Sequence, residues 1–153
     1  MKWKDLQNED CPVARGLSVM GDRWTLLLLR DCFLGVRRFD DFQKNLGVTR
    51  HVLADRLKLL CDRGVLEKRP YQDRPKRYEY KLTEKGKAFF PVLMTLINWA
   101  DEEFPTDSSS PYEFVARDTG KKLKPELTDA NTGERLELRN IIRKVSGQTE
   151  EVS

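Results

Sequence analysis

Histidine, cysteine and long apolar runs are scarce in this sequence of 153 residues, and each scarcity excludes a class of protein. His51 is the single histidine, and Cys11, Cys32 and Cys61 are the three cysteines. No two cysteines are close in sequence, which argues against the paired ligands of a zinc site. Their odd number and wide spacing favour free thiols in a reducing compartment over a disulfide framework.

Apolar runs are also too short for a membrane span. The longest candidate, 24–29, is ended by Arg30 and Asp31, far short of the roughly 20 residues that a bilayer core requires. The first five residues contain no apolar stretch of the kind found in a signal peptide. We therefore expect a cytoplasmic protein that makes no membrane contact.

Catalytic patterns are missing as well. The sequence contains no evident nucleophile–base pair, phosphate-binding loop or paired-carboxylate motif. His51 has no partner at ligand spacing, so a polar surface position is a better interpretation than a metal ligand or a general base. We expect no enzyme activity, no metal and no cofactor.

Charge is distributed unevenly along the chain, although the net charge is only +3. Residues 49–86 hold eleven Lys and Arg against six Asp and Glu, a net +5. Residues 101–153 hold eight against twelve, a net −4. A basic segment in the middle of the chain is well placed to contact phosphates.

Apolar periodicity and capping residues predict a series of helices in the first third of the chain. The first helix runs over 13–20 and stops at Gly21. Asp22 is a suitable N-cap for a second helix over 23–33. That helix is apolar on most sides, so we expect it to be central.

Two further helices are joined by a short turn. Asp40 is the expected N-cap of the third helix, with Gln43 reaching back as in a capping box. That helix ends at Gly47, and Thr49 can cap a fourth helix over 49–63. Two helices joined by a short glycine-containing turn are typical of a helix-turn-helix motif.

Beyond Gly64 the helical period gives way to an alternating one. Apolar or aromatic residues alternate with charged ones over 77–82, which predicts a strand, and 65–71 should be its antiparallel partner. Pro70 places that partner at a sheet edge, and 72–76 form the expected hairpin tip. A β-hairpin that directly follows a helix-turn-helix is a wing.

Residues 83–104 predict a last long helical region, which Pro91 should kink or divide. Its apolar coverage is wider than one stripe, so one side can cover the core while another side meets a partner. The predicted helices, the hairpin and this last helical region together form the first expected domain, residues 1–104, which would bind DNA and dimerise. A linker rich in Ser, Asp and Pro follows over 105–111.

The tail has a weak internal repeat. The turn sequence at 117–121 is echoed at 130–134, which predicts a small β-rich appendage over 112–145 with two tight turns. We expect residues 146–153 to be disordered.

The helix over 49–63 should have an inner and an outer face. Leu53, Leu57 and Leu60 recur at helical intervals and should be buried, whereas the opposite face of such a helix enters the major groove. The blander interpretation of that opposite face is a solvated surface. The candidate DNA contacts of this helix are Thr49, Arg50, His51, Ala54, Asp55, Arg56 and Lys58.

These residue types fit different parts of a duplex. Arg50 can donate to guanine edges, and Ala54 can contact a thymine methyl group. Arg56 and Lys58 are better suited to phosphates, which position a protein without reading sequence.

The predicted wing strengthens this interpretation. Residues 68–81 hold six Lys and Arg against two Asp and Glu, a net +4. A wing follows a phosphate backbone or a minor groove, and both attract cations. The alternative is a charged hairpin that keeps its exposed edge soluble. The candidate contacts here are Arg69, Arg74, Lys76 and Arg77.

A series of short motifs over about 11–104 resembles the HxlR-type winged helix-turn-helix regulators of bacteria in order and spacing. The resemblance implies a dimeric winged-helix fold and a repressor or activator that binds a roughly palindromic operator. The motifs are Cys11-Pro12-Val13, Gly21-Asp22-Arg23-Trp24, Arg38-Phe39, Leu53-Ala54-Asp55-Arg56-Leu57, Gly64-Val65-Leu66, Pro75-Lys76-Arg77-Tyr78-Glu79-Tyr80, Leu82-Thr83-Glu84-Lys85-Gly86 and Trp99-Ala100.

The same resemblance implies a dimer interface built from the N-terminal and C-terminal helices. Its expected residues are Val13, Leu17, Phe90, Leu93, Met94, Ile97 and Trp99. Cys11 resembles the N-terminal cysteine with which some members sense oxidants, quinones or aldehydes. A position at a helix N-terminus next to Arg15 would favour the reactive thiolate, and the alternative is an unreactive, partly buried thiol. Cys32 and Cys61 have apolar neighbours and are expected to pack.

The tail resembles the zinc-ribbon-like segment that some members carry, with two Cys-x-x-Cys-Gly turns. The matching positions here are Ala116/Thr119-Gly120 and Asp129/Thr132-Gly133, so the glycines are present and the cysteines are absent.

The sequence thus predicts a mainly α protein with a small β-hairpin, in the α+β class. The expected function is sequence-specific binding of double-stranded DNA by a homodimer, with a small-molecule or redox signal as a candidate effector. The alternative is a sensor or protein-interaction module that keeps the winged-helix fold without operator binding. The acidic tail, Asp55 and Asp62 motivate that alternative.

Overall fold

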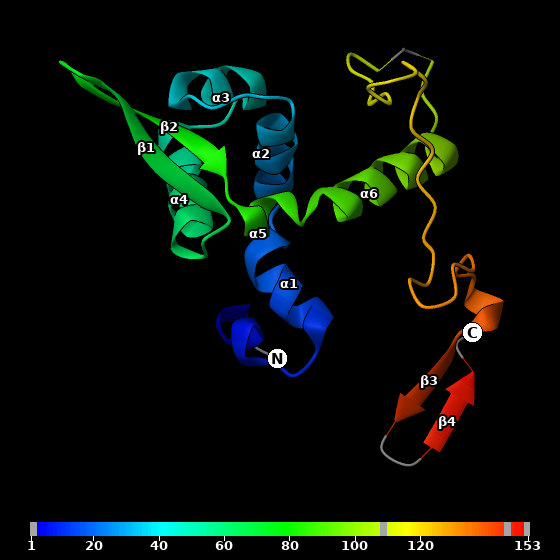
Figure 1. Ribbon diagram of the computed structural model, residues 1–153. Helices are drawn as coiled ribbons and strands as arrows, with labels where there is room; N and C mark the ends of the chain where they lie inside the picture. Colours follow the sequence, from blue (N-terminus) through cyan, green and yellow to red (C-terminus); the bar gives the residue numbers. More distant parts are fainter. Residues whose placement is uncertain (1–2, 108–109, 146–147, 152–153) are drawn as a thin grey trace. The chain divides into compact units, whose positions relative to one another are not determined.

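The computed structural model describes residues 3–107, 110–145 and 148–151. The chain divides into two compact units, Met1–Leu93 and Met94–Ser153, which we describe separately. The first unit begins with a 3-10 turn, η1 (Trp3–Asn8), and is otherwise made of helices and one hairpin. Its elements are α1 (Pro12–Met20), α2 (Arg23–Phe33), α3 (Phe39–Leu46), α4 (Arg50–Asp62), β1 (Leu66–Asp73), β2 (Lys76–Leu82) and α5 (Glu84–Lys87), followed by the start of α6 (Phe90–Glu103) (Figure 1).

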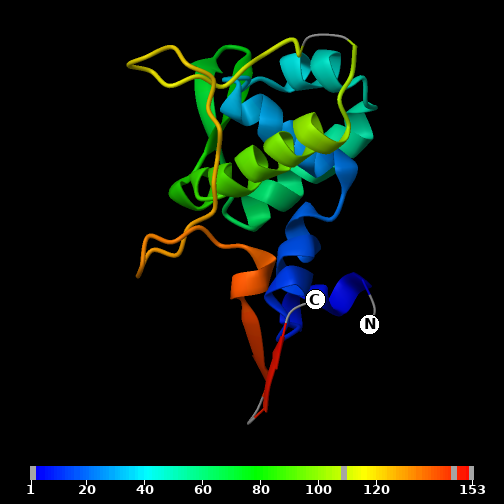
Figure 2. The ribbon, with the colours of Figure 1, turned by 90° about the vertical axis from the view of Figure 1, so that its right-hand side faces the viewer.

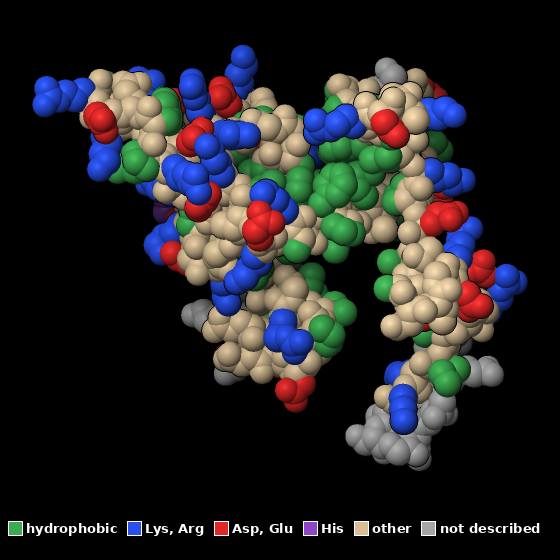
Figure 3. Space-filling view, in the orientation of Figure 1, with side chains coloured by type: hydrophobic (Ala, Val, Ile, Leu, Met, Phe, Trp, Pro, Cys, Tyr) green, Lys and Arg blue, Asp and Glu red, His purple; other side chains and the backbone are tan. Residues whose placement is uncertain are grey.

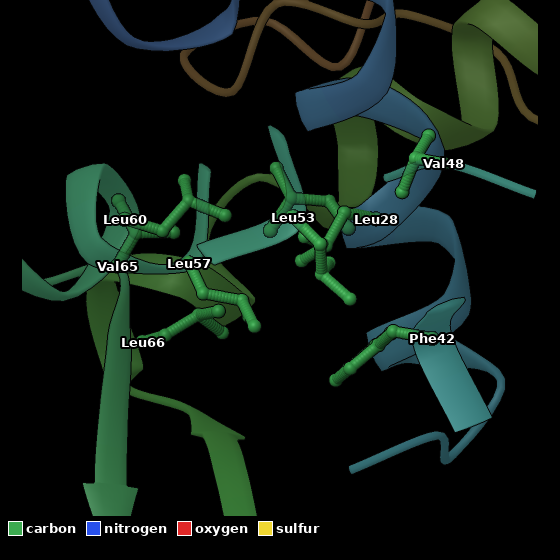
Figure 4. Close-up of a cluster of buried hydrophobic side chains, with 9 residues drawn as sticks. Leu28, Phe42, Val48, Leu53, Leu57, Leu60, Val65 and Leu66 are labelled. Atoms are coloured by element: carbon green, nitrogen blue, oxygen red, sulfur yellow. The ribbon is translucent and has the colours of Figure 1, made fainter. Parts of the chain in front are cut away.

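The core of this unit lies between α2, α3, α4 and the start of β1. Leu28 and Leu29 from α2 meet Phe42 from α3, and all three side chains are fully buried. The cluster is completed by residues of the turn before α4, of α4 itself and of the segment after it: Val48, Leu53, Leu57, Leu60, Val65 and Leu66 (Figure 4). The central position predicted for the second helix and the inner face predicted for the fourth are both confirmed.

Local sequence fixes the start of α2. The Asp22 carboxylate accepts hydrogen bonds from the backbone N–H groups of Trp24 at 2.9 Å and Thr25 at 3.3 Å. These amides have no partner inside the helix, so the cap supplies one. The predicted cap and the predicted bounds of this helix are therefore confirmed.

The cap predicted for the third helix is wrong. The N-cap of α3 is Arg38, which makes no side-chain capping hydrogen bond, and the helix begins two residues earlier than expected. Asp40 consequently lies inside the first turn, where a carboxylate interacts favourably with the helix dipole. Gln43 donates to the carbonyl of Val48 at 3.4 Å and makes no capping box.

The hairpin is a two-stranded antiparallel ribbon that is attached to the helices along one edge. Leu66 pairs with Leu82 and Asp73 with Lys76, with an irregularity between Pro70 and Gln72. The first strand thus extends two residues beyond the predicted 65–71, and the tip is narrower than expected. The Tyr80 N–H donates to the carbonyl of Arg37 at 2.8 Å, which ties the hairpin to the segment before α3.

The short helix α5 follows the hairpin and precedes the longer α6. Thr83 caps α5 by accepting from the Gly86 N–H at 3.1 Å. A side chain at Gly86 would place its Cβ 2.3 Å from the backbone oxygen of Val65, so the close approach of two segments requires glycine here. The predicted long helix is divided before α6, and Pro91 lies in the first turn of α6, where no donor is lost.

The helix α1 extends from one end of the group formed by α2, α3 and α4 (Figures 1 and 2). It packs on η1, where Leu6 and Ala14 are buried. Val13 and Leu17 on the same helix remain exposed.

The second unit continues α6 and ends in a hairpin. Its later elements are a 3-10 turn, η2 (Leu138–Asn140), and the paired strands β3 (Ile142–Val145) and β4 (Gln148–Glu151). Two tight turns precede them, each closed by one isolated β-bridge, Val115 with Lys122 and Thr128 with Arg135. The disorder predicted for 146–153 is not met at 148–151, which pair with β3, whereas 146–147 and 152–153 lie outside the described residues.

Candidate nucleic-acid interface

The turn between α3 and α4 sets the direction of α4. Gly47 has φ of 64°, the left-handed conformation that suits glycine at a helix end. Thr49 then caps α4, because its hydroxyl accepts from the Val52 N–H at 3.4 Å. The predicted Gly–Thr turn is confirmed, and α3 and α4 form a helix-turn-helix.

The outer face of α4 is exposed near its N-terminus. Thr49, Arg50 and Ala54 are exposed there, and the His51 side chain is 87% accessible. His51 Nε2 lies 3.3 Å from the Asp55 carboxylate, one helical turn away. Groups at the N-terminus of such a helix are the ones that reach base edges in a major groove.

One turn further along the same face, Lys58 pairs with Asp62. The hydrogen bond that Lys58 donates to Asp62 raises the pKa of the exposed Lys58 ammonium, which therefore stays charged. The pair leaves the charge of Lys58 partly compensated. A phosphate would compete with Asp62 for this ammonium.

Arg50 is held against α3. Its guanidinium donates to the Asp40 carboxylate at 3.2 Å and to the Gln43 side-chain oxygen at 3.3 Å, and it lies 4.6 Å from the centre of the Phe39 ring. Sequence reasoning placed Asp40 and Gln43 in a cap and missed this role. No local signal indicates this contact, because Asp40 and Arg50 lie on separate helices, ten residues apart.

Arg56 differs from the other predicted contacts. Its side chain is only 34% exposed, and its Nε lies 3.2 Å from the same Asp22 oxygen that caps α2. The structure thus places Arg56 between α4 and α2, away from the exposed face. An electrostatic tie between these helices is the role that this position supports most directly.

The hairpin supplies cations on an extended ribbon. Figure 3 shows Lys and Arg side chains gathered over the region of β1 and β2. Lys68 lies 4.3 Å and Lys76 5.6 Å from the centre of the Tyr78 ring, so one aromatic ring orients two ammonium groups. Arg69 pairs with Glu67 at 2.6 Å.

The tip of the hairpin is the least compensated part of this surface. Arg74, Lys76 and Arg77 are exposed and form no ion pair with a carboxylate among the residues that the structure describes. Further from the tip, a hydrogen bond from Lys81 lowers the pKa of Glu79, so that carboxylate stays ionised and compensates Lys81. Net positive charge is therefore concentrated at the tip, where a phosphate backbone can approach.

The residues predicted for a dimer interface fall into two groups. Val13, Leu17 and Trp99 are exposed apolar side chains, with Val13 67% and Trp99 53% accessible. Leu93 and Met94 are buried within the chain itself. Phe90 and Ile97 are half-buried, and Phe90 packs against Phe33 with ring centres 5.3 Å apart.

Cys11 occupies the N-cap position of α1 and is exposed. Its side chain makes no capping hydrogen bond. The nearby Arg15 guanidinium donates to the backbone carbonyls of Glu9 at 2.9 Å and Asp10 at 2.6 Å, which holds the segment that leads into Cys11.

The other two cysteines pack beside the core, as expected. Burial raises the pKa of the Cys32 thiol to about 12, and the neighbouring Asp31 charge adds to the shift. Burial also raises the pKa of Cys61. Both sulfurs are therefore neutral thiols near pH 7, which suits packing and disfavours nucleophilic chemistry.

A helix-turn-helix followed by a cationic hairpin defines the class of winged helix-turn-helix transcriptional regulators. Comparison with known families identifies the group within that class. Residues 19–108 match the family of HxlR-like helix-turn-helix proteins. The chain belongs to this family.

Similar proteins agree with this assignment. An uncharacterised HTH-type transcriptional regulator of Mycobacterium tuberculosis is 39% identical over 129 residues, covering 84% of this chain and 82% of its own. The crystal structure of PA1607, a protein with a proposed role as a transcription factor, has a TM-score of 0.80 at 36% identity, covering 93% of this chain and 98% of its own. The redox regulator HypR in its reduced form has a TM-score of 0.58 at 27% identity, covering 62% and 95%.

The chain is thus a transcriptional regulator with a helix-turn-helix domain, and its family and relatives are regulators rather than enzymes. The predicted α+β winged-helix fold is confirmed. Within the described ranges, none of the helices combines the length and apolar character needed to cross a bilayer.

Proposed function

We propose that this regulator binds duplex DNA sequence-specifically as a homodimer, with α4 in the major groove and the hairpin of β1 and β2 on the flanking backbone. The observation that carries the proposal is that the exposed start of α4 and the cationic hairpin belong to one compact unit. They are joined by a tight turn in which Gly64 has φ of 69° and the Val65 N–H donates to the Leu60 carbonyl at 2.9 Å. Their relative orientation is fixed by the core.

The two elements have different tasks in this proposal. Arg50, His51 and Ala54 face base edges, and Thr49, Asp55 and Lys58 flank them. The tip cations Arg74, Lys76 and Arg77, with Arg69 behind them, neutralise phosphates and contribute affinity without sequence information. Arg50 must exchange its contacts with Asp40 and Gln43 for contacts with DNA, because its donors are engaged in the free protein.

Exposed apolar side chains on α1 and α6 support a homodimer. Val13 and Leu17 on α1, and Val92, Leu96 and Trp99 on α6, are exposed in the single chain. Apolar residues that gather on helix faces in this way are typical of subunit interfaces. A two-fold dimer presents two copies of α4, which fits a roughly palindromic operator with half-sites about 34 Å apart.

We further propose Cys11 as a thiol that responds to oxidants or electrophiles. Its exposure supports this role, and HypR, a relative of this chain, is described as a redox regulator in both reduced and oxidised forms. The test is a gel shift before and after diamide treatment. A Cys11→Ser protein should lose the response and keep DNA binding, and an equal response in both proteins would refute the role.

The test of the DNA proposal is binding to the region upstream of the chain's own gene at several salt concentrations. Arg74→Ala with Lys76→Ala removes two tip cations per protomer, four per dimer. Because each phosphate contact contributes about 0.9 to the slope of log K against log salt, the slope should become shallower by roughly three to four. Lys121→Ala with Lys124→Ala is the control, since it removes the same charge from exposed positions in the second unit.

An unchanged slope in the Arg74 and Lys76 variant would refute the assignment of the wing. Arg50→Ala should behave differently from that variant. It should relax the preference at one base pair of each half-site and leave the salt slope nearly unchanged.

A protein-interaction module without operator binding is the second candidate. The observation that favours it is that Arg50, His51 and Lys58 on α4 each contact a carboxylate of the same chain. This candidate predicts no shift with the upstream DNA at any salt concentration, which separates it from the first.

A further inference from the structure

The second unit contains two structurally similar turns, whose equivalent positions are 13 residues apart in sequence. In the first copy, the Ala116 N–H donates to the Lys121 carbonyl and the Gly120 N–H to the Ala116 carbonyl, both at 2.8 Å. In the second copy, Asp129 and Gly133 make the equivalent bonds at 2.8 and 2.7 Å. The two glycines have φ of 65° and 73°. The two turns therefore share one backbone design and differ in their side chains.

The duplication extends to an ion pair at the base of each turn. Arg135 lies 3.4 Å from Glu126 in the second copy, and Lys122 lies 3.8 Å from Glu113 in the first. Among the residues that the structure describes, the first copy alone has an additional carboxylate, because Lys122 also donates to Asp101 of α6 at 3.4 Å. In the second copy, the one positive charge of Arg135 is matched by the one negative charge of Glu126. The first leaves two carboxylates facing a single ammonium, an excess of one negative charge.

A cavity of about 550 Å³ lies beside Lys122 and its two carboxylate partners, Asp101 and Glu113. The size falls within the range of about 300–1,000 Å³ that is common for small-molecule sites. Met94 and Ile97 of α6 and Leu123 supply apolar lining. Asp101, Glu113 and Lys122 all line the same space, so the excess negative charge borders the cavity directly.

Two aromatic rings complete the lining. Tyr112 and Phe114 also face the cavity, with ring centres 6.1 Å apart and an edge-to-face angle of 72°. Aromatic faces attract organic cations as well as apolar groups. Apolar walls, two rings and one uncompensated carboxylate therefore favour the same kind of molecule.

We propose that this cavity binds an amphipathic organic cation, a ring system that bears a protonated amine. The ring occupies the apolar lining, and the ammonium takes one of the two carboxylates while Lys122 keeps the other. The bound site is then neutral. For an anion of the same shape, the one cationic side chain among the described lining residues is Lys122, whose charge is already shared by two carboxylates.

The binding claim is independent of DNA binding, whereas a role for the ligand as an effector of the regulator depends on the proposed function. The link between the two is α6, which supplies one wall of the cavity and also exposes Leu96 and Trp99, two side chains of the proposed dimer surface. A ligand that alters the packing of this helix would alter the dimer.

The experiment uses three probes with one ring and different charge: 1-naphthylmethylammonium, 1-naphthylmethanol and 1-naphthylacetate. Each is titrated calorimetrically into the full chain at pH 7 and low salt, without DNA. We expect the cation to bind at least about tenfold more tightly than the anion, with the alcohol between them. The preference of the cation should shrink as salt rises, because part of its affinity is electrostatic.

Matched variants locate the site. Glu113→Gln should weaken binding of the cationic probe about tenfold, since one charged partner is worth roughly 1.4 kcal/mol at that fold-change. Glu126→Gln makes the same change at the equivalent position of the second copy and should leave binding unchanged. Both positions are exposed, and circular dichroism confirms that each variant is folded.

Three results would overturn the proposal: no binding of the cation up to millimolar concentration, equal binding of all three probes, or equal effects of Glu113→Gln and Glu126→Gln. A gel shift with and without the cationic probe then tests the effector role. Probe binding with unchanged DNA affinity would refute that role alone, and probe binding in a protein that shifts no DNA would refute the DNA proposal alone.

Discussion

Asp22 connects two parts of the first unit, and its replacement tests how α4 is held. One carboxylate oxygen caps α2 by accepting from two backbone amides and lies 3.2 Å from Arg56 of α4. Asp22→Ala removes both interactions. Asp22→Asn keeps a capping oxygen and removes the charge, and Arg56→Met keeps the apolar stem and removes the opposite charge.

The magnitudes follow from these contacts. Loss of an N-cap costs about 1 kcal/mol, within a range of 0.5–2. The partly exposed ion pair contributes roughly 0.5–1 kcal/mol after screening by solvent. We therefore expect Asp22→Ala to lower the free energy of unfolding by about 1–3 kcal/mol. Asp22→Asn and Arg56→Met should each lower it by about 0.5–1 kcal/mol.

The assay is urea unfolding followed by the helical circular dichroism signal, with the double variant completing a thermodynamic cycle. The double variant Asp22→Ala with Arg56→Met should cost less than the sum of the single changes by about 0.5–1 kcal/mol, because the pair is counted twice in that sum. Coupling near zero would refute the tie between α2 and α4. Equal losses for Asp22→Ala and Asp22→Asn would refute the capping contribution.

The same Arg56→Met protein decides between the two roles of Arg56. A side chain engaged with Asp22 predicts an unchanged salt slope for DNA binding. A phosphate contact predicts a slope shallower by about 0.9 for each protomer that makes it.

Two further outcomes follow from glycine placement and thiol burial. Gly86→Ala should destabilise the first unit by more than about 1 kcal/mol in urea unfolding, because its Cβ would meet a backbone oxygen at 2.3 Å. Gly16→Ala, which has open space around it in α1, should instead stabilise the helix by about 0.5–1 kcal/mol. Equal effects of the two substitutions would contradict the close approach at Gly86. Iodoacetamide at pH 8 should label Cys11 first, Cys61 more slowly and Cys32 only on unfolding, as followed by mass spectrometry. Because burial holds the pKa of Cys32 at about 12, above its ordinary 9.0, its contribution to stability is complete below pH 9 and is lost as the pH rises towards 12; early labelling of Cys32 in the folded protein would contradict this.

The elements that local chemistry specifies were predictable from the sequence. The bounds of α2, its Asp22 cap, the left-handed Gly47 and the Thr49 cap all depend on residues within a few positions of one another. The buried face of α4 followed from the helical spacing of its leucines.

Long-range contacts were not predictable in this way. Arg50 lies beside Asp40 and Arg56 beside Asp22 only because the turns of the first unit bring separate helices together. Periodicity cannot show such a pairing, since it describes one element at a time. The burial of Asp31 is a second example: its ion pair with the adjacent Arg30, at 2.7 Å, is local, but its exposure of only 1% depends on the elements packed around α2.

The paired turns of the second unit have a consequence for how this segment can change. They share main-chain hydrogen bonds and the left-handed Gly120 and Gly133, and the same backbone shape forms with the plain alanine side chain of Ala116 and with Asp129, whose carboxylate accepts from the Asn131 N–H at 2.9 Å. Substitutions at Ala116 and Asp129 can therefore introduce or remove side chains that ligate a bound ion, while the backbone of the turn keeps its shape. Point substitutions can therefore change the side chains that one turn presents, independently of the other turn, while the rest of the unit keeps its fold.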